Sequence, residues 1–207
     1  FTHLTFPSHW HYTVLRGLTH RGIAKAVDYT IHEAGPVVLF EHRETDVPLD
    51  RYLDTYGQNL DVGDRLDLVR QVAEALAYAH RQHLFHRALA ARSIWVSARP
   101  DGSRPVLRIS DWEVATRPSE TTSGLGSLEK TNLSGADVPV STHVYLAPEF
   151  DQPDADPLGM DVYGLGAISH LIITGKPPAP SRREVAERLR ADSGLVPSTL
   201  VDGLPTA

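Results

Sequence analysis

The polar residues best placed to do chemistry lie in one short stretch, residues 85–96, which reads FHRALAARSIWV. His86 could carry a proton near neutral pH, because an unperturbed imidazole titrates around pH 6.5. Arg87 brings a permanent positive charge and Ser93 a hydroxyl oxygen, whereas Ala88 has no polar atom. The stretch contains no carboxylate, so any carboxylate chemistry would have to come from another part of the chain.

Composition restricts the other kinds of metal site. The chain has no cysteine, so neither a disulfide nor a thiolate metal site can form. Its 11 histidines are scattered, and none forms a His-x-x-x-His pair beside a carboxylate on an expected helix. His9 and His11 are close in sequence, and we expect exposed or capping residues there rather than metal ligands.

Size and charge limit the class of protein and its partners. The 207 residues suffice for one domain, or one large lobe, with a sizeable core. The net charge of −6 argues against nucleic acid or an acidic membrane surface as a partner, and no apolar run reaches the roughly 18 residues that span a bilayer. We therefore expect a cytoplasmic protein, and the abundance of Ala and Arg over Lys suggests a bacterial source. The chain does not begin with Met, so we expect it to be a piece of a longer protein.

The elements that must position residues 85–96 are a helix before them and two strands after them. Residues 61–82 carry apolar residues at the helical period, and Asp61 or Asp64 could cap the start of that helix. Short strands are predicted at 94–97 and 106–110, with a turn at 99–102 between them.

The flanking regions are predicted to be mixed helix and strand. The predicted helices cover 8–18, 49–53, 160–174 and 181–190, and strands at 24–29 and 36–41 form an antiparallel hairpin packed on the first helix. Ser181 and Glu184 have the spacing of a capping box. Residues 116–141 are polar and without a period, which predicts a long loop.

Residues 85–96 resemble the catalytic loop of the protein kinase family, HRDLxxxxN, and four further segments resemble other kinase motifs in the family's order. One such motif alone would be a weak signal, but five in order indicate the fold. The resemblance covers about residues 10–190. The four are LRGLTHRGI at 15–23 (end of helix C), ISDWE at 109–113 (the DFG position), YLAPE at 145–149 (the APE position) and DVYGLG at 161–166 (the central helix of the large lobe).

The resemblance implies an α+β protein kinase-like fold of the serine/threonine type. Residues 1–42 would form a partial N-lobe, with helix C, two strands and the hinge, and residues 43–207 a mainly helical C-lobe that ends before the family's last helices. The Gly-rich loop and the strand lysine of the family are not in this sequence.

Departures from the family pattern fall on chemical positions. Ala88 stands where the family has the Asp that orients and accepts the hydroxyl proton of the substrate. Ser93 replaces the metal-binding Asn, Glu113 replaces the Gly of DFG, and His11 stands where helix C should carry a Glu. Asp111 retains the carboxylate that the family uses to hold Mg²⁺.

The retained residues are expected to be structural. The resemblance places His86 in a buried stack with Trp112, assigns backbone hydrogen bonds to Asp161, and makes Glu149 an anchor. Arg87 has two open roles, receiving a phosphate from the activation loop or pairing with a carboxylate. A nucleotide site, if there is one, would draw on Phe40 (the gatekeeper position), Glu41, Ser93 and Asp111.

Three functions follow as hypotheses. The first is a catalytically inactive pseudokinase that acts as a regulatory or scaffolding module toward other domains of its parent or toward a partner protein. The second is a divergent serine/threonine kinase with weak ATP-dependent phosphotransfer, which would need ATP and Mg²⁺. The third is an interaction module that binds neither.

Overall fold

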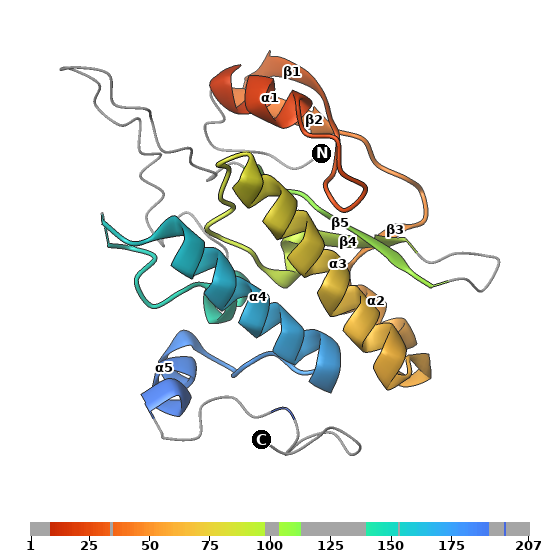
Figure 1. Ribbon diagram of the computed structural model, residues 1–207, viewed down its shortest axis with the longest axis vertical. Helices are drawn as coiled ribbons and strands as arrows, with labels where there is room; N and C mark the ends of the chain where they lie inside the picture. Colours follow the sequence, from red (N-terminus) through yellow and green to blue (C-terminus); the bar gives the residue numbers. More distant parts are fainter. Residues whose placement is uncertain are drawn as a thin grey trace.

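The computed structural model describes residues 9–33, 35–97, 104–112, 140–152, 154–190 and 197. It has an α+β architecture with a two-stranded sheet near the N-terminus, a three-stranded sheet, and a set of helices packed against the latter (Figure 1). No helix in these ranges is both long and apolar enough to cross a membrane. The predicted turn at 99–102 and most of the predicted loop at 116–141 lie outside the described ranges, while residues 140–141 open the short helix η5 (Val140–Tyr145).

The first sheet is an antiparallel hairpin that packs on a helix, as predicted. Strand β1 (Ala26–His32) pairs with β2 (Gly35–Phe40), and helix α1 (His9–Arg16) lies against β1 (Figure 1). The rings of Tyr12 and Tyr29 stack between helix and strand, with centroids 6.0 Å apart. Strand β1 begins later than expected because the backbone of Ala24 is used elsewhere: its N–H donates to Ile109 O at 2.8 Å.

The second sheet has the antiparallel order β3-β4-β5, formed by β3 (Asp46–Pro48), β4 (Ile94–Ser97) and β5 (Val106–Ile109). The sequence did not predict β3, because three residues ending in Pro48 carry no strand period. The contacts of Asp46, the first residue of β3, explain why the strand forms there. The Asp46 carboxylate is buried and bonds to the Ser97 hydroxyl of the adjacent strand β4 and to the Arg108 guanidinium of β5.

The remaining helices pack against this sheet or against other helices. They are α2 (Leu49–Tyr56), the short η1 (Gly57–Asn59), α3 (Val62–Arg81), α4 (Pro157–Thr174) and α5 (Arg182–Arg190). Helices α3 and α4 run side by side (Figure 1). Asp61 and not Asp64 caps α3: its Oδ1 accepts from the Asp64 N–H at 2.7 Å.

Helix α4 begins and ends, and helix α5 begins, at residues with clear capping geometry. Helix α4 begins earlier than the expected residue 160, because Asp156 accepts from the N–H groups of Leu158 and Gly159. It ends at Gly175, whose φ of 70° is the left-handed conformation that glycine adopts without steric cost. Helix α5 begins after Ser181, whose hydroxyl accepts from the Glu184 N–H at 3.3 Å.

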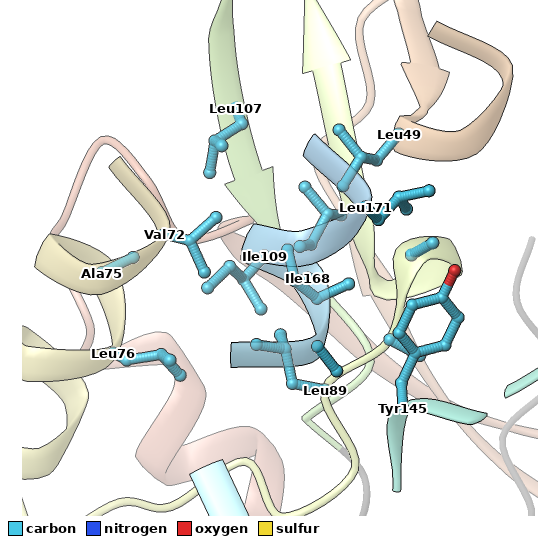
Figure 2. Close-up of a cluster of buried hydrophobic side chains, with 14 of the residues drawn as sticks. Leu49, Val72, Ala75, Leu76, Leu89, Leu107, Ile109, Tyr145, Ile168 and Leu171 are labelled. Carbon is cyan, nitrogen blue, oxygen red and sulfur yellow. The ribbon is translucent and has the colours of Figure 1, made fainter. Parts of the chain in front are cut away.

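The core lies where α3, α4 and the second sheet meet. Ile109 and Ile168 approach each other at its centre, with Val72, Leu76 and Leu89 around them (Figure 2). Helix α4 supplies buried residues on several sides, which is typical of a helix enclosed by other elements. Packing of this kind fixes the directions of α3, β5 and α4, and these three elements carry the candidate site.

A backbone junction ties the first sheet to the rest of the molecule. Residues 19–24 lie against β5 and α3: the Ile109 N–H donates to Gly22 O at 2.9 Å, and the Thr19 N–H donates to the Tyr78 hydroxyl at 3.1 Å. The His20 ring stacks on the Tyr78 ring at 5.0 Å. Residues 41–45 make the other connection between the sheets, and the expected division after residue 42 falls there.

Candidate functional site

The catalytic-loop-like stretch connects α3 to β4 and is held by buried apolar residues. Leu84, Leu89 and Ala90 are buried, and the short helix η2 (Ala91–Ser93) leads into the strand. Arg87 has a φ of 68°, a left-handed conformation that is uncommon for a residue with a side chain. Such a conformation persists only where neighbouring groups fix the backbone.

The carboxylate of Asp161, on α4, fixes the backbone conformation of Arg87. This carboxylate is fully buried and accepts from the backbone N–H of His86 at 2.9 Å and of Arg87 at 2.5 Å. The His80 Nε2 also donates to it, at 2.8 Å. The kinase resemblance implies the two backbone bonds; the His80 contact was not predicted, although His80 lies at the end of a predicted helix. Burial lowers the pKa of the half-buried Arg87 guanidinium, and the Asp161 charge opposes that effect.

His86 and Trp112 form the buried stack that the resemblance implies. Both side chains are fully buried, and their ring centroids lie 4.8 Å apart. The His86 Nε2 donates to Ser110 O at 2.9 Å, so its Nδ1 is the unprotonated nitrogen in the neutral ring, and that atom is buried without a hydrogen-bond partner. A ring enclosed in this way has no contact with solvent, so its role here is packing.

Asp111 follows β5 and carries the carboxylate on which nucleotide chemistry would depend. Its φ of 58° is left-handed, like that of Arg87. One oxygen, Oδ1, is buried without a hydrogen-bond partner, and the other, Oδ2, lies 3.9 Å from the Arg92 Nε. Burial raises the pKa of this carboxyl above its usual range, and the neighbouring His86 and Arg92 partly counter the shift.

The residues present fit a bound Mg²⁺ only in part. The unpartnered Asp111 Oδ1 suits a hard cation, since a buried carboxylate oxygen without a partner is costly. Ser93 is buried, and its carbonyl oxygen, not its side chain, makes the described contacts, accepting from the Ser110 N–H at 2.7 Å and the Ser110 hydroxyl at 3.3 Å. Within the described ranges no group of three or more His, Asp or Glu residues could hold a metal ion. Asp111 could therefore supply one ligand, and phosphate oxygens and water would have to supply the others.

Ala88 is half-buried in the same loop, with Leu89 and Ala90 after it. None of residues 85–93 carries a carboxylate, so the described loop places no base at the position where the family has one. Glu113 lies outside the described residues. His11 lies within α1.

Phe40 and Glu41 end the first sheet. Phe40 is half-buried and packs against the core, while Glu41 is exposed, and its N–H donates to Lys25 O at 2.9 Å. Among the described contacts, no hydrogen bond or ion pair joins either residue to Ser93 or Asp111. The structure thus brings together Ser93, Asp111, His86 and Asp161, and leaves the link from Phe40 and Glu41 to them a prediction.

The segment around Glu149 is held by an arginine that the sequence did not reveal. The Arg182 guanidinium donates to Ala147 O at 3.4 Å, to Pro148 O at 3.1 Å and to Asp151 Oδ2 at 3.0 Å. Glu149 is half-buried, and its carbonyl oxygen accepts from the Gln152 N–H. In the sequence Arg182 stands at the start of a predicted basic helix, and no local pattern indicates which groups its guanidinium contacts.

Comparisons with known proteins agree with this geometry. The model of the protein kinase domain family matches residues 11–197. The chain is 41% identical over 208 residues to the "Probable kinase PglW" of Streptomyces coelicolor, covering 92% of this chain and 13% of that protein. It is 29% identical to the serine/threonine-protein kinase PkaA of the same organism, covering 94% of this chain and 34% of that protein. The chain thus spans only a minor part of these relatives. The extent of the family match leads to one conclusion: the chain belongs to the protein kinase domain family.

Proposed function

We propose that this chain is a kinase-fold domain without phosphotransfer activity, a pseudokinase that regulates an adjoining domain of its parent protein or holds a partner protein in the cytoplasm. Residues 1–42 would be its partial N-lobe and residues 43–207 its C-lobe. The observation that carries the proposal is Ala88, which lies in a loop held in a defined conformation by Asp161. The loop has a defined backbone conformation, but the side chain of Ala88, at the position of the family's base, has no polar atom.

The surroundings of Ala88 support the same proposal. Phosphoryl transfer depends on positioned charge, and the family's base and metal ligands supply much of it. Here Ser93 offers a shorter oxygen ligand than Asn, and Arg92 lies beside the one retained metal-binding carboxylate. Each change weakens a different part of the reaction, so restoring one residue should leave the others deficient.

The direct test is phosphotransfer by the full-length protein. We expect Mg²⁺ and γ-labelled ATP to give no labelling of the protein or of general acceptor proteins above the level of an Asp111→Ala variant. Ala88→Asp should raise labelling by less than the roughly 10²–10⁴-fold that a missing acid–base group accounts for, because Ser93 remains. Robust labelling by the unaltered protein, lost in Asp111→Ala, would overturn the proposal.

The second candidate is a divergent serine/threonine kinase with slow activity. It is supported by the buried, unpartnered oxygen of Asp111, which suits Mg²⁺, and by the name of the Streptomyces coelicolor relative, "Probable kinase PglW". This candidate requires nucleotide binding. If ATP and Mg²⁺ leave the thermal unfolding of the full-length protein unchanged, it fails, and the third hypothesis, an interaction module that binds neither ATP nor Mg²⁺, takes its place.

A further inference from the structure

The indole of Trp95, on β4, lies against the connection between the two sheets. Its neighbours Ile94 and Val96 are buried in the core, so the Trp95 side chain points to the opposite face of the three-stranded sheet, where it is half-buried. On that face it reaches the connection at residues 41–45. The rings of Trp95 and His42 meet edge to face there, with their centroids 5.3 Å apart.

The indole nitrogen is bound to the segment that carries Asp111. Trp95 Nε1 donates to the Ser110 hydroxyl at 3.0 Å, and that hydroxyl donates to Ser93 O at 3.3 Å. Ser110 is buried and directly precedes Asp111, whose Oδ1 is buried without a hydrogen-bond partner. One side chain therefore spans the distance from the residue after Glu41 to the residue before Asp111.

The connection that carries His42 is held against this face of the sheet. The Arg43 N–H donates to Asp46 Oδ2 at 3.0 Å, and the His42 Nδ1 lies 3.8 Å from the same oxygen. The buried Asp46 carboxylate also bonds to Arg108, which is the cross-strand neighbour of Trp95 in the β4–β5 pair. The contact between His42 and Trp95 therefore joins two elements whose positions are fixed by other bonds.

The surroundings of the indole define what could take its place. Aromatic rings in direct contact have centroids about 4.5–7 Å apart, so at 5.3 Å no planar group lies between Trp95 and His42. A ligand in the place of the indole would contact the His42 ring and lie near the unpartnered oxygen of Asp111. A flat aromatic ring that carries a Mg²⁺-bound phosphate meets both conditions. Purine, like indole, is a fused five- and six-membered ring system.

We infer that the Trp95 indole occupies the place of a purine ring, so that the domain competes with nucleotide for its own site. The indole has to leave before Mg²⁺-nucleotide binds, and the measured affinity falls in proportion to the fraction of molecules in which it has left. The hydrogen bond to Ser110 and the contact with His42 oppose that movement. This role rests on the proposed function and deepens it, because it adds restricted nucleotide binding to the absence of a general base at Ala88.

The test measures the binding of Mg²⁺-ADP and of Mg²⁺-pyrophosphate to the full-length protein by isothermal titration calorimetry. Trp95→Leu removes the indole and keeps an apolar side chain, so it should raise the affinity for Mg²⁺-ADP by about tenfold or more. The affinity for Mg²⁺-pyrophosphate, which has no ring, should stay unchanged. The matched control is Tyr56→Leu, which replaces an exposed ring on α2 and should bind both probes like the unaltered protein.

A second variant, Ser110→Ala, weakens the hold on the indole without removing the ring. It deletes the acceptor of the Trp95 Nε1–H, so it should raise the affinity for Mg²⁺-ADP by about 2–10-fold, the equivalent of one hydrogen bond, again without a change for Mg²⁺-pyrophosphate. Thermal unfolding of each variant would verify that it is folded. If Trp95→Leu does not fold, Ser110→Ala decides the question.

Two outcomes would overturn the role of Trp95. One is an equal affinity of the unaltered protein and the folded variants for Mg²⁺-ADP, which includes the absence of binding by all of them. The other is a parallel gain for Mg²⁺-ADP and Mg²⁺-pyrophosphate, which would mean that Trp95 acts on the phosphate and not on the purine. Phosphotransfer by the unaltered protein would instead contradict the proposed pseudokinase function, and the ADP comparison would still decide whether Trp95 competes with the purine.

Discussion

The Nε of Arg92 lies 3.9 Å from the Oδ2 of Asp111, so a guanidinium stands beside the carboxylate that the kinase family uses to hold Mg²⁺. The Arg92 side chain is 43% exposed and that of Asp111 12% exposed. Because solvent screens the guanidinium, the pair resembles a surface ion pair in strength, about 0.2–1 kcal/mol. That energy is small, but it opposes the binding of a second positive charge at the same carboxylate.

Replacing Arg92 by Gln should therefore strengthen Mg²⁺ binding. We expect an affinity about 2–5-fold higher, from the loss of the competing charge. Isothermal titration of Mg²⁺ in the presence of a non-hydrolysable ATP analogue would measure it in the full-length protein. Arg92→Lys, which keeps the charge, should resemble the unaltered protein. An Arg92→Gln affinity equal to or lower than the original would show that the pair does not compete with the metal.

Asp161→Asn should be among the most destabilising polar substitutions in the chain. The buried carboxylate accepts from His80, His86 and Arg87, and an amide would present a donor to at least one of these donors. We expect the free energy of unfolding to fall by about 3 kcal/mol, as measured by urea denaturation.

The matched control for Asp161→Asn is Glu187→Gln, which removes an exposed pair with Arg183 on α5. It should cost less than about 0.5 kcal/mol. A similar loss in both variants would contradict the role assigned to Asp161.

Two glycines should respond oppositely to alanine. A Cβ on Gly22 would lie 3.0 Å from the Cβ of Ala75, at the junction of the first sheet with α3, so Gly22→Ala should destabilise by about 1–3 kcal/mol. A Cβ on Gly166, inside α4, would meet nothing within 4 Å, so Gly166→Ala should stabilise by up to about 1 kcal/mol. Thermal unfolding would rank the two variants, and a stabilised Gly22→Ala would mean that the junction is less tightly packed than described.

His170 should make the domain lose stability on mild acidification. Its Nδ1 donates to Lys176 O at 3.1 Å, and burial lowers the pKa of the imidazole below its usual value of about 6.5. Between the folded and unfolded pKa values the unfolded chain binds more protons, so stability falls as the pH falls below about 6.5. His170→Asn keeps a donor and cannot titrate, so its unfolding free energy should fall less than that of the unaltered protein between about pH 7 and pH 5. His20, whose pKa burial also lowers, remains in both proteins and does not affect the difference. If the unfolding free energies of the two proteins fall in parallel as the pH is lowered, titration of His170 does not contribute to the pH dependence of stability.

Most elements could be predicted from local patterns, and those that could not depend on distant partners. The helix predicted over residues 61–82 and the strands predicted at 94–97 and 106–110 correspond to α3, β4 and β5, with β5 ending one residue earlier, since local pattern and tertiary packing favour the same state there. Strand β3 was missed because its stability comes from Arg108 and Ser97, far away in sequence. The early start of α4 was missed because its cap, Asp156, lies in a Pro- and Asp-rich segment that favours a turn.

The candidate site shows the same division. The order and spacing of the kinase-like motifs were enough to predict that His86, Asp111 and Asp161 lie close together. It could not reveal His80, Arg92 or Arg182, whose partners are backbone carbonyls or carboxylates on other elements. Nor could it reveal the cavity of about 380 Å³ between α2, residues 90–92, η5, Leu171 of α4 and residues 175–180, since only the fold brings these segments together.

The hydrogen bonds described between Asp161 and this loop come from the backbone N–H groups of His86 and Arg87, and this has an evolutionary consequence. The shape of the loop does not depend on the residue at position 88. A single codon change there could separate a catalyst from a non-catalytic paralogue without disturbing folding. Selection for catalysis would therefore act on position 88, and selection for folding would act on Asp161 and the residues that hold the loop backbone.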